Sequence, residues 1–121
     1  IGRVAAGRPI LAEENIEARL DIDPSIFQPK PHYLLKVVGM SMKDAGILDG
    51  DLVGVQRSAD ARDGQTVIAR IDGELTIKRL QRTPRRIRLL PRNPDYAPIE
   101  VRPGQDFAIE GLYCGLVRPN A

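Results

Sequence analysis

The sequence has one cysteine, no tryptophan and no long apolar run, and each shortage excludes a class of protein. Cys114 alone cannot form an intrachain disulfide, and Cys114 with the one histidine, His32, supplies too few ligands for a structural zinc site. No apolar run approaches the roughly 20 residues of a membrane-spanning helix, and residues 1–11 lack the apolar stretch of a signal peptide. We therefore expect a cytoplasmic protein with no metal and no cofactor.

The sequence also lacks a large excess of positive or negative charge. Lys and Arg number 18 against 16 Asp and Glu, a net charge of +2, which is far below the basic excess typical of proteins that bind phosphate backbones. The 121 residues, 42% hydrophobic and 28% charged, fit one ordinary globular domain with a single core. The chain begins without Met, and we expect it to be a piece of a longer protein.

Turn-forming pairs such as Asp49-Gly50, Asp63-Gly64 and Pro103-Gly104 recur at short intervals, and the apolar runs between them have the length of strands. The best strand candidates are 33–38, 51–56, 66–71, 74–80, 87–90 and 107–117. Helix has room only near 12–19 and in a turn after Ser41, and the small residues of 5–7 suit an exposed linker or loop. This pattern predicts a mostly β fold, a compact antiparallel sheet closed or half closed into a barrel.

The clearest local prediction is a hairpin around Asp72-Gly73, a pair that supplies the positive φ angles of a type I′ turn. In that register Lys78 lies opposite Val67, and its neighbours on the same face are Thr76 and Leu80. The Lys78 side chain then lies either in solvent, as strand lysines usually do, or over an apolar patch.

Ser41 stands where a strand meets a helical turn, and this position has two interpretations. In the first, Ser41 is an N-cap and Asp44 completes a capping box, as is common for serine. In the second, Ser41 is a nucleophile, and its own amide and a neighbouring one bind a developing oxyanion. A base is then required. His32 is one candidate; a buried neutral lysine is the other, and Lys78 lies deepest in a predicted sheet.

Three stretches carry a resemblance to a known family: Gly2-Arg-Val-Ala-Ala-Gly7, residues 33–52 around Gly39-Met-Ser-Met-Lys-Asp44, and residues 67–80. The similarity continues through 89–96 and 109–112, so it spans essentially the whole chain. In these motifs the chain resembles the C-terminal self-cleaving domain of the LexA family, the repressors of the bacterial SOS response and members of the S24 peptidases.

The resemblance implies a serine-lysine endopeptidase that cuts its own chain. Ser41 would be the nucleophile, Lys78 the general base, and the amides of Met40 and Ser41 the oxyanion hole. The scissile bond would be Ala6-Gly7. Residues 1–11 would then be the cleavage-site segment and 12–121 the catalytic and dimerisation domain, whereas the family's helix-turn-helix domain is absent from this chain.

The resemblance also implies partners. The first substrate is the chain itself, and a RecA filament on single-stranded DNA would act as co-protease by favouring the closed state. A homodimer would form through the C-terminal strand near 109–117, since exposed edges pair readily. Operator DNA would be bound only by the missing N-terminal domain.

Two further features have ordinary explanations. Seven basic residues and no acidic one lie between Lys78 and Arg92, which suits a solvated hairpin flank, although acidic protein or phosphate could bind there. Cys114 lies in an apolar run and is expected to be a small packing residue.

Three other functions stay open at this point. One is a UmuD-type polymerase accessory protein, in which the cut follows Cys rather than Ala; another is a phage repressor of the same family. The third is a non-catalytic β-barrel that binds nucleic acid through its Arg-rich hairpin.

Overall fold

The computed structural model describes residues 2–5, 10–11 and 23–119, and these form nine strands and two short 3₁₀ helices. The strands are β1 (Gly2–Ala5), β2 (Ile10–Leu11), β3 (Tyr33–Val38), β4 (Leu52–Arg57), β5 (Thr66–Ile71), β6 (Glu74–Arg82), β7 (Ile87–Leu90), β8 (Ile99–Val101) and β9 (Phe107–Val117). The helices are η1 (Pro24–Ile26) and η2 (Lys43–Ala45). Neither helix is long and apolar enough to cross a membrane, a finding that covers the described residues alone. The helix expected near 12–19 lies outside those residues.

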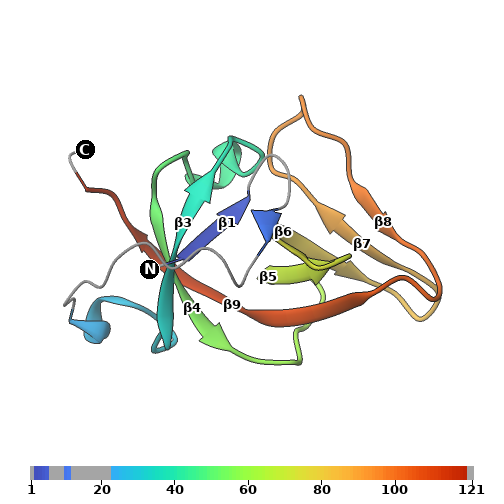
Figure 1. Ribbon diagram of the computed structural model, residues 1–121, viewed down its shortest axis with the longest axis horizontal. Helices are drawn as coiled ribbons and strands as arrows, with labels where there is room; N and C mark the ends of the chain where they lie inside the picture. Colours follow the sequence, from blue (N-terminus) through green and yellow to red (C-terminus); the bar gives the residue numbers. More distant parts are fainter. Residues whose placement is uncertain (1, 6–9, 12–22, 120–121) are drawn as a thin grey trace.

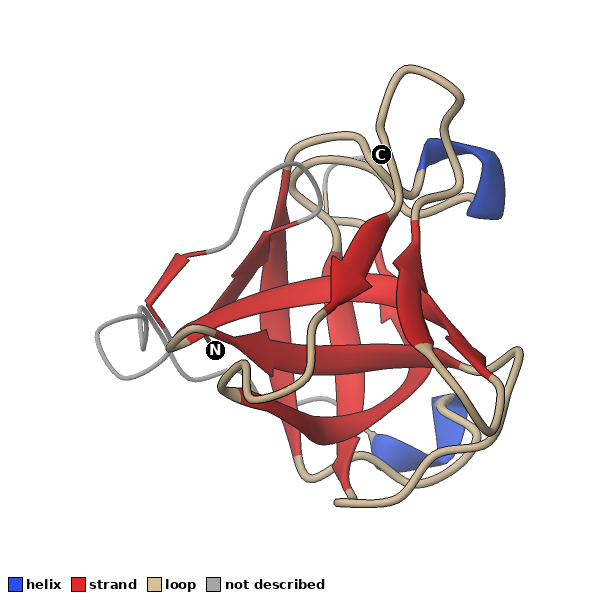
Figure 2. Cartoon of the chain, turned by 90° about the vertical axis from the view of Figure 1, so that its right-hand side faces the viewer, coloured by secondary structure: helices blue, strands red, loops and turns tan. Residues whose placement is uncertain are grey.

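Seven strands form an antiparallel sheet in the order β3-β4-β9-β5-β6-β7-β8. β1 runs parallel to β3, and its last residue, Ala5, pairs with both Val38 of β3 and Thr76 of β6. Three strands separate β3 from β6 in the sheet, so a neighbour common to both requires the sheet to curl into a half-barrel (Figures 1 and 2). The predicted mostly β, barrel-like fold is therefore confirmed.

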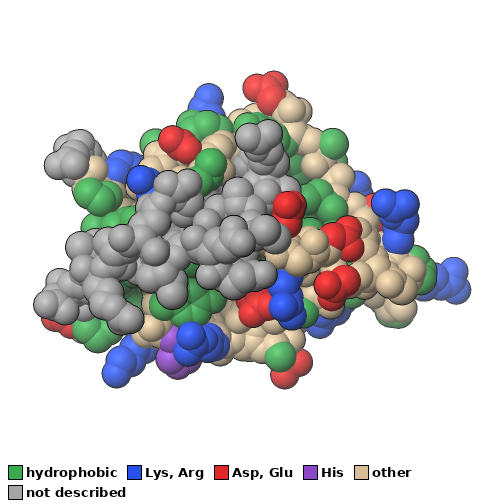
Figure 3. Space-filling model, viewed as in Figure 1, with side chains coloured by type: hydrophobic (Ala, Val, Ile, Leu, Met, Phe, Trp, Pro, Cys, Tyr) green, Lys and Arg blue, Asp and Glu red, His purple; other side chains and the backbone are tan. Residues whose placement is uncertain are grey.

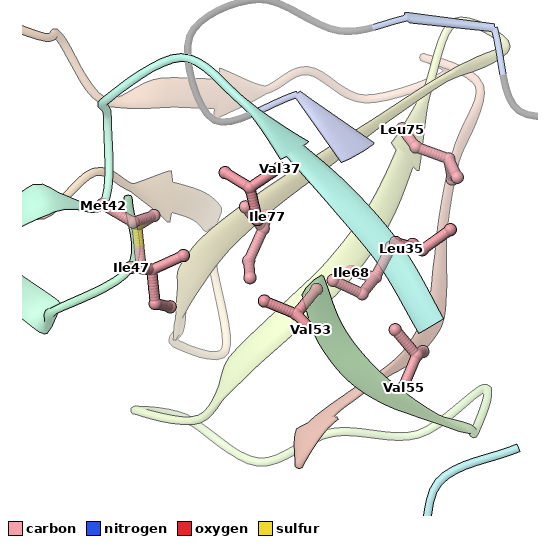
Figure 4. Close-up of a cluster of buried hydrophobic side chains, with 9 residues drawn as sticks. All are labelled: Leu35, Val37, Met42, Ile47, Val53, Val55, Ile68, Leu75 and Ile77. Atoms are coloured by element: carbon pink, nitrogen blue, oxygen red, sulfur yellow. The ribbon is translucent and has the colours of Figure 1, made fainter. Parts of the chain in front are cut away.

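The two faces of the curled sheet pack against different apolar clusters, because successive side chains of a strand point to opposite faces. In β5, Ile68 belongs to the first cluster, whereas Val67 and Ala69 belong to the second. The first cluster also takes Met42 and Ile47 from the connection between β3 and β4, as Figure 4 shows. The connection that carries Ser41 is therefore anchored in the core.

The hairpin between β5 and β6 matches its prediction. Asp72 and Gly73 have φ angles of 51° and 83°, and Val67 pairs with Lys78 in the expected register. Strand boundaries elsewhere differ slightly: β4 begins at Leu52 instead of Asp51, and β6 continues to Arg82. Strands β1, β2 and β8 were not predicted, and β1 and β2 lie in residues 1–11, which were expected to be the cleavage-site segment.

An ion pair between a buried carboxylate and a partly exposed guanidinium joins the end of β9 to the start of β4. Arg118 Nε lies 2.7 Å from Asp51 Oδ1, and the Asp51 side chain is only 1% exposed. Arg118 Nη2 also donates to Asp51 Oδ2 and to the Gly46 carbonyl. Burial alone would raise the pKa of Asp51, but the hydrogen bonds from Arg118 and the Leu48 amide, with the Arg118 charge, hold it below its usual value.

We expect Arg118→Ala to lower the free energy of unfolding by about 2–3 kcal/mol at neutral pH, because it leaves a buried carboxylate without its opposite charge and with only the Leu48 amide as donor. Since the pKa of Asp51 is lowered in the folded state, this stabilisation is present above the ordinary carboxyl pKa of about 4 and is lost as the pH falls below it. Urea titrations at several pH values measure both effects. Arg102→Ala, which removes an exposed guanidinium, is the control, and an equal loss in both variants would contradict the role of the ion pair.

Candidate active site

Ser41 lies in the connection between β3 and β4, and its side chain is completely buried, with 0% exposed. Among the described residues its hydroxyl oxygen has no hydrogen-bond partner, which is uncommon for a buried polar group. Helix η2 begins at Lys43, its N-cap is Met42, and no side chain caps it. The N-cap interpretation of Ser41 is therefore wrong, and no residue in the described ranges bonds to the buried hydroxyl.

The backbone around Ser41 is fixed from two sides. Met42 and Ile47 pack against Val37 and Ile77 in the first apolar cluster (Figure 4). On the other side, the Arg92 amide donates to the Ser41 carbonyl at 2.7 Å, and the Arg92 carbonyl accepts from the Asp44 amide at 2.7 Å. These two hydrogen bonds to the backbone of Arg92, which lies beyond the end of β7, were not predicted from the sequence.

Lys78 is buried in β6, with 2% of the residue exposed, so it does not have the solvated position usual for strand lysines. Burial lowers its pKa from 10.5 to about 8. Lys78 Nζ donates to Thr76 Oγ1 at 2.7 Å and to the Ile77 carbonyl at 3.2 Å. A lysine with such a pKa is neutral in an appreciable fraction of molecules near pH 8, as a general base must be.

The edge of β6 that faces away from β5 is interrupted beside Lys78. Along this edge β2 pairs with Glu74 and Leu75, β1 pairs with Thr76, and β7 pairs with residues 79–82. Within the part of the chain that the structure describes, no strand pairs with this edge at Ile77 and Lys78. Unpaired backbone of this kind can accept an extended peptide as an added strand.

Ser41 follows β3 and Lys78 lies in β6, and both strands pair with the last residue of β1. Ala5 pairs with Val38, three residues before Ser41, and with Thr76, two residues before Lys78. Both side chains therefore lie on segments that flank the end of β1. They are not hydrogen-bonded to each other, since Lys78 Nζ is bonded to Thr76 and Ile77 and Ser41 Oγ is unbonded.

The residues expected to form an oxyanion hole have free donors. Among the hydrogen bonds between described residues, none is donated by the amides of Met40 or Ser41. A shallow cleft of about 350 Å³ lies nearby, lined by residues that include Asp44, Arg92 and Tyr96, but neither Ser41 nor Lys78 contributes to it.

The other candidates have different surroundings. His32 precedes β3 while Ser41 follows it, and a six-residue strand spans about 20 Å. In addition, His32 Nδ1 accepts a hydrogen bond from the Arg57 amide at 2.9 Å. Cys114 is a buried packing residue, as expected, and burial raises the pKa of its thiol. Ala6 and Gly7 lie outside the described residues.

The basic stretch after Lys78 is partly neutralised. Arg86 forms two hydrogen bonds with Glu100, and Arg88 pairs with the same carboxylate. Figure 3 shows Lys and Arg side chains projecting at the end of the molecule where the turn between β6 and β7 lies. In the described ranges, no three His, Cys, Asp or Glu side chains are grouped so that they could hold a metal ion.

Comparison with known proteins agrees with a half-barrel that buries a serine and a lysine. The Peptidase S24-like family matches residues 1–114, and the chain therefore belongs to this peptidase family. It is 63% identical over 120 residues to LexA repressor 2 of Xanthomonas axonopodis pv. citri, which covers 99% of this chain and 56% of that protein. It is 62% identical to the LexA repressor of Xylella fastidiosa strain M12 over the same share of the chain.

The resemblance to the LexA family noted in the sequence is thus confirmed. The chain spans little more than half the length of these curated relatives, 56% and 57%.

Proposed function

We propose that this chain is the self-cleaving domain of a LexA-type repressor of the SOS response, with Ser41 as nucleophile, Lys78 as general base and Ala6-Gly7 as scissile bond. The proposal rests on one observation: two unusual groups lie on the segments that flank the end of β1. These are a fully buried serine hydroxyl that has no partner among the described residues and a buried lysine whose pKa is about 8.

The register of β1 supports the position of the substrate. β1 runs parallel to β6 and meets it at Ala5 and Thr76, so a chain continuing in that direction would reach Lys78 two residues further on. Counted along the sequence, the bond after Ala6 would fall within this distance. In the reactive state we propose that the segment occupies the interrupted edge of β6, where it would also exclude water from Lys78.

The reaction follows from the groups present. Neutral Lys78 Nζ removes the proton of Ser41 Oγ as this oxygen bonds to the carbonyl carbon of Ala6. The amides of Met40 and Ser41 stabilise the negative charge on the carbonyl oxygen. When the carbon–nitrogen bond breaks, Lys78 returns the proton to the Gly7 nitrogen, and water then hydrolyses the ester between Ser41 and Ala6.

The proposed partners are those that the resemblance to the LexA family implies. A RecA filament on single-stranded DNA would accelerate cleavage at neutral pH by favouring the closed state. A second copy would bind through β9, because β5 accompanies β9 only as far as Leu112 and leaves one edge of its last residues without a neighbouring strand among those described. Operator DNA would be bound by a part of the repressor outside this sequence.

The experiment that tests the proposed function is mass spectrometry of the chain after incubation at about pH 9 to about pH 10, where most of Lys78 is neutral. Two fragments that meet between Ala6 and Gly7 are expected, and RecA filaments should produce the same fragments near neutral pH. An intact chain under both conditions would refute the proposal. Salt-sensitive DNA binding by such an uncleaved chain would favour a non-catalytic nucleic-acid module.

Gly7→Val tests the scissile bond. A branched side chain at the leaving nitrogen would obstruct the approach of the carbonyl to Ser41, so we expect self-cleavage to fall by about 100-fold or more. The unfolding free energy should change by less than about 0.5 kcal/mol if the segment is outside the core. Ala97→Val, the addition of two methyl groups in an exposed loop, is the control. Wild-type cleavage in Gly7→Val would show that the bond has been misplaced.

A further inference from the structure

The loop that follows β7 holds two consecutive peptide groups at Ser41. The Arg92 amide donates to the Ser41 carbonyl, and the next residue, Asn93, donates from its side-chain Nδ2 to the Met40 carbonyl at 2.9 Å. The Met40 contact joins residues 53 positions apart in the sequence. It is made by a side chain, so unlike the Arg92 contact it can be removed by substitution.

The Met40 carbonyl belongs to the same peptide group as the Ser41 amide. A trans peptide is planar, and its carbonyl and N–H point in opposite directions. A hydrogen bond that fixes the carbonyl therefore also fixes the direction of the N–H. In the described part of the chain the Ser41 N–H makes no hydrogen bond of its own, so nothing on its donor side sets this direction.

We infer that Asn93 is a positioning residue for catalysis: through the Met40 carbonyl, it orients the Ser41 amide toward the place where the oxyanion develops. This inference rests on the proposed function, because it assigns the Ser41 amide to the oxyanion hole. Asn93 does not touch the reacting atoms. It acts by holding one peptide group in the orientation that the transition state requires.

The Asn93 side chain is itself held in the orientation that this role requires. Its Oδ1 accepts a hydrogen bond from the Asp95 amide at 2.9 Å, which directs Nδ2 toward Met40. Pro91 and Pro94 lie on either side and restrict the backbone of the loop. The donor is thus arranged before the substrate arrives.

Other contacts hold the Ser41 connection in the fold. Met42 and Ile47 are buried in the first apolar cluster, and Asp49 Oδ1 accepts from the Gly39 amide at 2.7 Å. The Met40 carbonyl also accepts a hydrogen bond from the Lys43 amide at 3.1 Å, and Asn93 supplies the shorter of the two at 2.9 Å. We therefore expect the loss of the Asn93 side chain to leave the connection in place and to loosen the peptide between Met40 and Ser41.

The test compares Asn93→Ala and Asn93→Asp with Asp95→Ala, measuring self-cleavage rates from about pH 7 to about pH 11. In Asn93→Ala the limiting rate at high pH should fall by about 10- to 100-fold, part of the effect of losing an oxyanion-hole donor. The midpoint of its pH profile should stay at the wild-type value, because Lys78 is untouched. Asn93→Asp is nearly isosteric and can still accept from the Asp95 amide, but its ionised carboxylate cannot donate to Met40, so its limiting rate should fall at least as far.

Asp95→Ala is the matched control, because it changes an exposed side chain of the same loop and keeps the amide that Asn93 accepts from. Its rate should stay within about twofold of wild type. A limiting rate within about twofold of wild type in Asn93→Ala would overturn the inference, and so would a fall accompanied by a shifted midpoint, since that would place Asn93 at the base.

A second measurement separates this inference from the proposed function. In amide NMR spectra, Asn93→Ala should shift the Ser41 resonance, while Asp95→Ala leaves it in place. If wild type does not cleave itself, the proposed function fails. The NMR comparison then decides alone whether Asn93 orients this peptide, and an unchanged Ser41 resonance in Asn93→Ala overturns the inference.

Discussion

Ser41→Ala and Lys78→Ala are each expected to reduce self-cleavage by about 10⁴-fold or more, because either change removes an essential part of one catalytic unit. In the proposed reaction, no oxygen attacks without Ser41, and nothing removes its proton without Lys78. The double variant should be no slower than either single variant, since the two effects belong to the same step. Fragment yield over time at about pH 9 measures all three rates.

Two control variants distinguish the loss of a catalytic group from the nonspecific effect of a substitution to alanine. Ser25→Ala removes an exposed hydroxyl, and Lys43→Ala removes an exposed ammonium group two residues from Ser41. Both should cleave at the wild-type rate. Residual cleavage at the Ala6-Gly7 bond in Ser41→Ala would mean that another nucleophile acts. Wild-type cleavage in Lys78→Ala would mean that another base acts, and His32 would then be tested.

The stability of Ser41→Ala distinguishes the two interpretations of this serine. A capping serine stabilises its helix, and its replacement by alanine lowers the free energy of unfolding by about 1 kcal/mol. A buried hydroxyl without a partner has the opposite effect, since its removal relieves a desolvation cost of about 1 kcal/mol or more. Because no described residue bonds to Ser41 Oγ or caps η2 with its side chain, we expect the variant to be at least as stable as wild type.

Local sequence patterns were sufficient for the fold class and for the hairpin. The turn at Asp72-Gly73 depends on the φ angles of two adjacent residues, and once it is placed, the register brings Lys78 opposite Val67. Strand β8 was missed because it has three residues and pairs with β7 alone among the described strands. The pairing of β1 with β3 joins residues about thirty positions apart, and no local pattern encodes it.

Local sequence patterns predicted less of the candidate site than of the fold. Residue spacing placed Thr76 on the same face as Lys78, but it could not show that Lys78 is buried, because burial depends on segments far away in the chain. From the residues alone, a helix cap was the favoured interpretation of Ser41. The resemblance identified it as a candidate nucleophile, and the unbonded hydroxyl now agrees with that. Asn93 and Arg118 bond to partners 53 and 67 residues earlier, so their roles had no sequence signal.

Lys78→Met is expected to stabilise the protein at neutral pH while it abolishes cleavage. The pKa of Lys78 falls from 10.5 to about 8 on burial, so between these pH values the unfolded chain binds more protons than the folded one. The unfolding free energy of wild type should therefore rise as the pH increases from about 8 to about 10.5, relative to Lys78→Met. At pH 7 the protonated lysine then destabilises the fold by roughly 3 kcal/mol, and methionine, which fills a similar volume, removes this cost.

The protonation of Lys78 should determine both the free energy of unfolding and the rate of self-cleavage. Self-cleavage of wild type should increase with pH and level off above the pKa of about 8, and the stability difference between wild type and Lys78→Met should begin to shrink in the same pH range. Urea unfolding and fragment yield, measured on the same samples, compare the two curves. Lys43→Met, which replaces an exposed lysine, should leave both curves unchanged. Two results would contradict the assignment of Lys78 as a buried base. One is a cleavage rate that is already constant at pH 7 without RecA, and the other is a Lys78→Met variant that is less stable than wild type at neutral pH. Either result requires that burial does not destabilise the charged amine.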